Sequence, residues 1–169
     1  AEDPTVLDYM PFFNGSKWVY SLSNGEKETV TVEGMKIIDN RAVIETKSSL
    51  TGVNHYMLNA NQLYQFKGLR QQGQKIIYNE GILLLDLPFS AGTIWSSNFE
   101  PVGTPYIEVI AIEDLTQKGK TYKNTAKIGI KKFTSPNYDV IIWIAPNVGI
   151  VKSLENHIIK ELESFTPGK

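Results

Sequence analysis

The sequence predicts an all-β, single-domain protein built on one large, strongly curved antiparallel sheet. Short segments of alternating apolar and polar residues recur along the chain, separated by Gly, Asn, Asp and Pro. No long segment shows the helical periodicity that parallel crossovers would need. A sheet of about a dozen strands has to curl, close or split into two layers. We therefore expect a half-barrel, with a closed calycin-like barrel or a two-sheet sandwich as the alternatives.

The N-terminal strands carry the strongest pattern. Alternation in Lys17–Ser23 places Trp18 and Tyr20 on one face. The dipeptide Asn24-Gly25 is a typical hairpin turn, and it leads into a second alternating segment, Lys27–Glu33. Further candidate strands follow at short intervals, at Met35–Ile38, Arg41–Lys47, Val53–Leu58, Gln62–Phe66, Gln74–Tyr78, Gly81–Leu87, Tyr106–Ile112, Thr121–Phe133, Asp139–Ala145, Gly149–Leu154 and His157–Leu162.

Two of these segments indicate where they lie in the sheet. In Thr121–Phe133, Tyr122 shares a face with Ala and Ile residues, while lysines occupy the other face, which indicates one solvated side. Asp139–Ala145 is apolar on both faces, so we expect it centrally or beneath a cover. A helix over Asn59–Gln72 is the best helical alternative, and Thr5–Tyr9 could form one turn. We expect one domain over 1–169, with a flexible lead over about 1–8 and a flexible tail over 166–169.

Composition narrows the function classes. The chain has 169 residues, of which 41% are hydrophobic and 21% are charged, and its net charge is −1. Such a chain has no basic excess to hold a phosphate backbone, so we expect no nucleic-acid partner. The apolar runs are far shorter than the roughly 20 residues of a membrane helix. Cysteine is absent, which excludes disulfides, thiol nucleophiles and Cys-ligated metals.

The motifs of catalysis and cofactor binding are missing from the sequence. His55 and His157 stand in no metal-ligand spacing, and no Gly-x-Ser-x-Gly elbow or phosphate-binding loop occurs. The close carboxylate pairs, Glu113-Asp114 and the pair Glu161 and Glu163, are explained better as surface residues than as a glycosidase pair. We expect a protein without enzymatic activity, cofactor or metal.

Aromatic residues are the remaining candidates for a binding site. Trp18, Tyr20, Tyr122 and Trp143 can each lie on the inward face of a strand. They either pack in the core or form the wall of a cavity for an apolar ligand. We take these four residues as the candidate ligand-binding residues.

Three segments combine Pro, Gly and Trp: Tyr9–Tyr20, Leu87–Trp95 and Trp143–Lys152. Pro and Gly fix turn geometry, and the large aromatic beside them needs burial. We expect the tryptophans to pack at these turns. We also expect Gly149 to resist substitution, because its backbone conformation or a close neighbour excludes a side chain.

The same segments, with Thr121–Ile128 and Glu161-Leu162, resemble a recurrent pattern in bacterial secreted and lipoprotein-like domains of unknown function. The match covers the chain from Tyr9 to about Phe165. It departs at Lys120, where that pattern often has Gly. The resemblance implies an extracytoplasmic β domain akin to the LolA/LppX-like lipoproteins, half-barrels that hold acyl chains. The helices that line or plug the LolA cavity are not visible in this sequence.

From this resemblance we expect a non-enzymatic cell-envelope protein that binds an apolar or lipid-like ligand in the concave face of its sheet. The alternative is a structural or protein-interaction domain with a filled core, docking another envelope protein. We further expect export by a removed signal peptide ending in a lipidated Cys just before Ala1. The removed lipid anchor would be the one link to the membrane.

Overall fold

The fold is all-β, as predicted. The computed structural model describes residues 4–38, 41–67, 70–72, 75–77, 80–96, 105–132 and 136–169. Within them lie one short helix and fourteen strands, and the predicted strand ends Gln74, Tyr78 and Phe133 fall outside the described residues. The elements are α1 (Val6–Tyr9), β1 (Lys17–Leu22), β2 (Lys27–Ile38), β3 (Arg41–Ser48), β4 (Gly52–Leu58), β5 (Gln62–Lys67), β6 (Arg70–Gln72), β7 (Lys75–Ile77), β8 (Glu80–Asp86), β9 (Ile94–Ser96), β10 (Pro105–Gln117), β11 (Lys120–Lys132), β12 (Val140–Ala145), β13 (Gly149–Glu155) and β14 (Ile158–Thr166).

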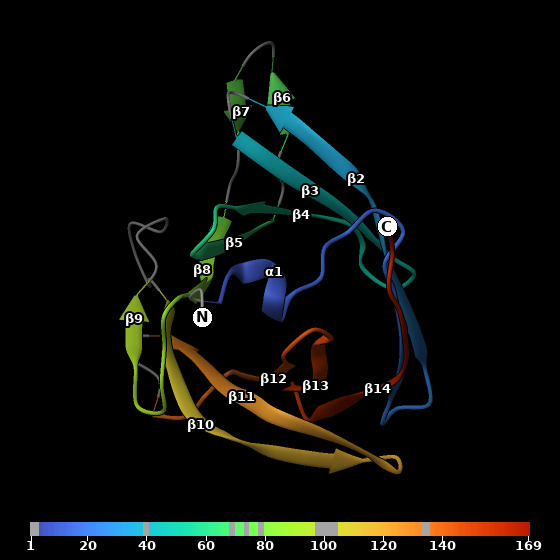
Figure 1. The fold of residues 1–169 in the computed structure, drawn as a ribbon, viewed down its shortest axis with the longest axis vertical. Coiled ribbons are helices and arrows are strands. Elements are labelled where there is room, and N and C mark those ends of the chain that lie inside the picture. The colour runs from blue at the N-terminus through green and yellow to red at the C-terminus, as the bar shows by residue number, and fades with distance from the viewer. Residues whose placement is uncertain are drawn as a thin grey trace.

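Twelve of the described strands form one antiparallel sheet that curls into a nearly closed barrel (Figure 1). Their order is β8-β5-β4-β3-β2-β1-β14-β13-β12-β11-β10-β9, and β6 and β7 form a separate hairpin. The first and last strands pair in the middle of this order, and each half continues outward as a meander. The order is therefore that of an up-and-down barrel, with its one break between β8 and β9.

A side chain joins the two edges at that break. Trp95 on β9 donates its indole N–H to the carbonyl oxygen of Leu83 on β8, at 2.7 Å. The connection between these strands, residues 87–93, is also hydrogen-bonded to both halves of the sheet. Leu87 N donates to Asn61 O, and Gly92 N donates to Val109 O. The middle Pro-Gly-Trp segment thus carries the chain from one edge of the sheet to the other.

The inward face of the barrel is the hydrophobic core. Cross-strand pairs such as Ile107 with Ile130 and Ala126 with Ile144 point inward together. Many of these side chains are fully buried, among them Leu63, Leu85, Ile107, Val109, Ile128, Ile144 and Val151. A second apolar cluster, Val43, Met57 and Phe66, is buried on the opposite face of β3, β4 and β5.

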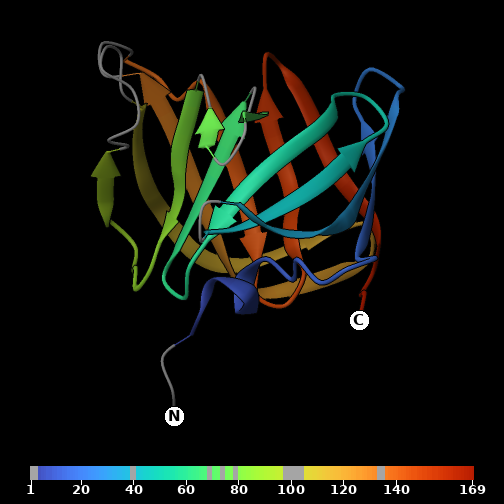
Figure 2. The same cartoon turned by 90° about the horizontal axis from the view of Figure 1, so that it is seen from above.

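The N-terminal segment covers one end of the barrel (Figures 1 and 2). Thr5 starts α1 with its N–H and hydroxyl both bonded to the Asp8 carboxylate. Val6 is fully buried, and its N–H donates to Ala60 O between β4 and β5. Asp8 O accepts from Asn147 N, in the turn between β12 and β13. The helix is thus bound to both halves of the sheet.

Both chain ends are docked more firmly than we expected. We predicted a flexible lead over 1–8, but the described part of it, residues 4–8, enters α1 and buries Val6. Residues 1–3 lie outside the described residues. In the predicted flexible tail, Gly168 N donates to Ser16 Oγ and Lys169 N to Asn14 O. The predicted turn over Thr5–Tyr9 is confirmed. The described residues hold no helix with the length and apolarity of a bilayer crossing.

Gly149 lies at the close approach that its sequence context predicted. Its φ is +96°, and an added Cβ would stand 3.3 Å from Trp18 Nε1 and 3.4 Å from Met10 Sδ. The Trp18 indole donates to Val148 O at 2.6 Å, so the ring cannot move away without losing this bond. Backbone conformation and crowding therefore both exclude a side chain.

We predict that Gly149→Ala destabilises the protein more than Gly119→Ala does. Both glycines have positive φ, so each substitution should cost about 1–2 kcal/mol of backbone strain. An added Cβ at Gly119 meets nothing within 4 Å, whereas Gly149 is crowded. Urea melts of the two variants measure the difference, and equal losses of unfolding free energy would show that the Trp18 contact does not matter.

Candidate functional site

Trp18 and Tyr20 lie side by side on the inner face of β1, as their spacing predicted. Each donates a hydrogen bond across the intervening β14: Trp18 Nε1 to Val148 O, in the turn before β13, at 2.6 Å, and Tyr20 Oη to Ile150 O on β13 at 2.7 Å. These carbonyls are accessible because β13 and β14 pair only over Lys152–Glu155. Trp18 lies near α1, where it meets Phe12, and Tyr20 lies two residues further from that end.

Beyond Tyr20, the inner face becomes polar. Glu28, which pairs with Tyr20 across β1 and β2, is 6% exposed. Its carboxylate accepts a hydrogen bond from Ser48 Oγ at 2.5 Å and pairs with Lys160 Nζ at 2.9 Å. Lys160 Nζ also lies 4.7 Å from the centre of the Tyr20 ring, a cation–π contact. We call Tyr20, Glu28, Ser48 and Lys160 the inner polar cluster.

Burial and the carboxylate hold the nearby phenols neutral. Burial raises the pKa of Tyr20 well above its ordinary value, and the charges of Glu28, Tyr56 and Tyr122 act in the same direction. Burial, followed by the charge of Glu28, raises the pKa of Tyr56 to about 12. Tyr56 packs against Phe12 of the N-terminal segment, with ring centres 4.7 Å apart. The inner polar cluster therefore borders the apolar packing beneath α1.

Lys160 is the partly exposed member of the inner polar cluster, whereas Tyr20, Glu28 and Ser48 are buried. The Lys160 side chain keeps 25% of its surface exposed. Its cross-strand neighbours Leu22 and Ser153 are half-buried. Val30, the cross-strand neighbour of Trp18 and therefore nearer the covered end, is half-buried as well. In contrast, Leu63 and Leu85 are fully buried. The two ends of the interior thus differ: the covered end is packed and apolar, and the other end is mixed and partly exposed.

The other two candidate residues, Trp143 and Tyr122, lie on β12 and β11. Trp143 pairs with Lys127 and Lys152, whose ammonium groups stand 5.5 and 4.9 Å from its ring centre. It alternates with the inward-facing Ile142 and Ile144, so Trp143 lies on the convex face and our expectation of an inward position was wrong. The reason is that β12 is apolar on both faces, which leaves its orientation undetermined by pattern.

Tyr122 is half-buried in the far half of the β10–β11 hairpin, opposite Leu115. Figures 1 and 2 show this hairpin running outside β13 and β14. Its tip is bound there, because Gln117 Nε2 donates to Val151 O and Lys118 Nζ donates to Ser21 Oγ. The structure therefore brings together Trp18 and Tyr20. Tyr122 lies close enough for its charge to act on Tyr20, whereas Trp143 lies on the opposite face of β12 from the inward-facing Ile142 and Ile144.

Sequence reasoning missed Glu28, Ser48 and Lys160. A signal was present, because Glu28 shares a face of its strand with Val30 and Val32, and Lys160 shares a face with Ile158 and Leu162. A charged residue on the apolar face of an amphipathic strand is unusual, since burial of an unpaired charge is costly. Two such residues of opposite sign would have suggested an internal ion pair, although not which strands meet.

The polar residues considered for catalysis have structural contacts. Asp114 Oδ1 accepts from Asn124 N at a bulge of the β10–β11 hairpin, and Glu163 pairs with Lys27 and Lys118 on the convex face. Burial lowers the pKa of His55, with Glu45 opposing and Lys36 adding to the shift. Among the described residues, no group of three or more His, Cys, Asp or Glu is placed to hold a metal ion.

Comparison with known proteins supports the fold. The chain matches no protein-family model and no curated protein. It is similar to a crystal structure from Parabacteroides distasonis that is provisionally described as a lipoprotein, with a TM-score of 0.52. The similarity covers 98% of this chain and 100% of that one, at 15% sequence identity. At this identity the match shows a shared fold.

We predict that the protein loses stability as the pH rises above about 10, and that Tyr56→Phe reduces this loss. An unfolded tyrosine ionises near pH 10, whereas folded Tyr56 keeps its proton to about pH 12. Above pH 10 the folded state therefore binds more protons than the unfolded state, so the free energy of unfolding falls. Urea melts from pH 8 to 11 test this, and parallel curves for the two proteins would contradict it.

Proposed function

We propose that this protein is a non-enzymatic cell-envelope domain that binds a lipid-like, amphipathic ligand at the uncovered end of its barrel. The observation that carries the proposal is the inner polar cluster, placed next to partly exposed apolar side chains at that end. An apolar wall with a few fixed polar groups is the usual composition of a small-molecule site.

The number of strands supports a ligand inside the sheet. A barrel of about eight strands is just wide enough for its own side chains to fill, and wider barrels enclose cavities or ligands. This sheet has twelve strands, and the N-terminal segment adds Val6, Met10 and Phe12 to one end of its interior. No comparable segment of the described chain covers the other end (Figure 2).

Lys160 is the residue best suited to recognise the head group. An ammonium group has three donors, and one of them is directed to Glu28 at 2.9 Å. Its partial exposure leaves room for a carboxylate or phosphate of a ligand. The tail of such a ligand would follow the half-buried Leu22 and Val30. The Lys160 ammonium group would thus fix the orientation of an amphipathic ligand, which the apolar side chains alone would bind in either direction.

The envelope location rests on two similarities, one of structure and one of sequence. The similar structure from Parabacteroides distasonis is provisionally described as a lipoprotein. The sequence pattern near Trp18 and Trp143 resembles that of exported bacterial domains. Both observations agree with the export that we expected, and the absence of cysteine is compatible with an oxidising compartment.

A filled-core interaction domain is the second candidate. The complete burial of Val6, Leu63 and Leu85 favours it, because a side chain that lines a cavity keeps surface free. In that case the inner polar cluster would serve only to orient strands. The two candidates differ in whether the uncovered end accepts a molecule.

Titration with a fluorescent long-chain fatty acid, together with native mass spectrometry in palmitate, separates the two. We predict one bound ligand per chain, with affinity reduced about tenfold or more in Lys160→Met and in Val30→Trp, which fills the site. The matched control is Lys27→Met, because Lys27 is 70% exposed and pairs with Glu163 on the convex face. Thermal melts confirm that each variant is folded. Absence of binding by the wild type, or equal binding by all variants, would favour the filled core.

A further inference from the structure

Among the described residues, the far part of β2 has a neighbouring strand on one side only. Pairing between β1 and β2 covers Lys17–Ser21 against Lys27–Thr31, and two more backbone bonds join Val32 to Gly15 and Ser16. Beyond this point, Glu33 stands in a bulge, Gly34–Ile38 pairs with β3 on one side, and no described residue pairs with the other side of this segment. Figure 1 shows this part of β2 extending past the barrel together with β3.

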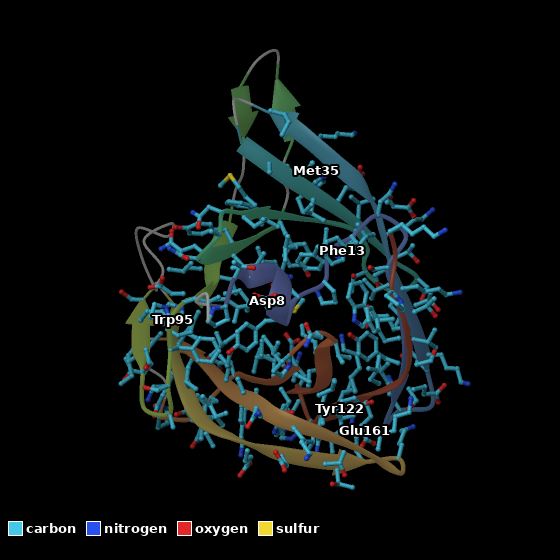
Figure 3. All side chains as sticks on the ribbon, viewed as in Figure 1. Asp8, Phe13, Met35, Trp95, Tyr122 and Glu161 are labelled. Atoms are coloured by element: carbon cyan, nitrogen blue, oxygen red, sulfur yellow. The ribbon has the colours of Figure 1, made fainter. Side chains whose placement is uncertain are left out.

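This edge also carries the most exposed large apolar side chains of the described residues. Met35 is 64% exposed and Ile37 is 67% exposed. They are two residues apart, so they share one face of the strand. Lys36 lies on the opposite face, where its side chain is 68% exposed and its ammonium group stands 3.6 Å from Glu45. Figure 3 shows Met35 on this extension, away from the interior.

Natural edge strands usually carry protection against pairing. The other long free edge, on β10 beyond Val109, bears the adjacent acidic residues Glu113 and Asp114, and its end is bound to β13 through Gln117. On the described part of the β2 edge, protection is limited to a bulge at Glu33 and to Lys36, and beyond the bulge the strand exposes Met35 and Ile37. Such an edge is suited to accept an extended strand from another chain.

We propose that Glu33–Ile38 binds an extended segment of another protein as an added antiparallel strand. The segment has an acidic residue between two apolar residues. The apolar residues face Met35 and Ile37, and the acidic residue faces Lys36, because directly opposite residues share a face of the sheet. Backbone hydrogen bonds supply the affinity, and these three side-chain positions supply the selectivity.

A second copy of this chain fits the edge less well. If Met35 faces Ile37 of the second copy, then Lys36 faces Lys36 of that copy, and like charges directly opposite are destabilising. If Met35 faces Met35, then Ile37 faces Glu33. Charge therefore favours a partner with an acidic residue at the central position. This inference is independent of the ligand proposed for the barrel interior.

The test is a charge swap in solution. The probe is an acetylated, amidated seven-residue peptide of alternating Val and polar residues with Glu at its centre; the comparison peptide has Lys there. Amide chemical-shift titration should show shifts centred on Glu33–Ile38 for the Glu peptide and at least about fivefold weaker binding of the Lys peptide. Lys36→Glu should reverse this preference, and N-methylation of the peptide backbone should abolish binding.

Each other outcome overturns the proposal. Equal binding of the two peptides by wild type and Lys36→Glu would show that Lys36 does not select the partner. Shifts elsewhere, or no binding, would show that the edge does not accept a strand. A dimer in sedimentation that Met35→Ser and Ile37→Ser together dissociate would assign the edge to a second copy. Fatty-acid binding, measured on the same double variant, should equal that of the wild type.

Discussion

Closure at the junction of β8 and β9 is the constraint on which the rest of this structure depends. Every other neighbouring pair of strands in the circle is joined by a backbone ladder, including the first strand with the last. At this junction the edges are joined by the indole of Trp95 on Leu83 O and by the short connection of residues 87–93. Because β8 and β9 are consecutive in the sequence, this connection keeps the two edges close and lowers the entropic cost of closing the sheet.

The closed sheet explains the position of the N-terminal segment. An open sheet would leave one layer of apolar side chains facing solvent, whereas the curved sheet gathers them around an interior that α1 covers at one end. Aromatic side chains connect α1 to the β8–β9 connection. The ring centres of Tyr9 and Phe89 are 5.3 Å apart, and those of Phe89 and Trp95 are 6.4 Å apart. The packed end and the closing edge therefore stabilise each other. The inner polar cluster lies beyond this packed region, where internal pairing satisfies most of its polar groups.

The sequence predicted the sheet well and the site incompletely. Alternation and the Asn24-Gly25 turn located the first hairpin, because one face of each strand is buried and pairing is local. The Pro-Gly-Trp segments correctly marked turns where Trp18, Trp95 and Gly149 pack. The face of Trp143 could not be predicted, since the preceding Ile141 and Ile142 place apolar side chains on both faces of the strand. The pair Glu28 and Lys160 joins residues more than 130 positions apart, and only the pairing of β1 with β14 brings them together.

Comparison of Trp95→Phe with wild type tests the closure most directly. The substitution keeps an aromatic ring but removes the donor to Leu83 O, which should cost about 1–3 kcal/mol because a buried carbonyl loses a partner. Amide exchange should accelerate in β8 and β9 and stay unchanged in β1 and β14. The exposed substitution Phe13→Leu is the control for unfolding free energy in urea. Loss of stability with faster exchange confined to the two edges is the predicted result; stability and exchange equal to those of the control would contradict the account.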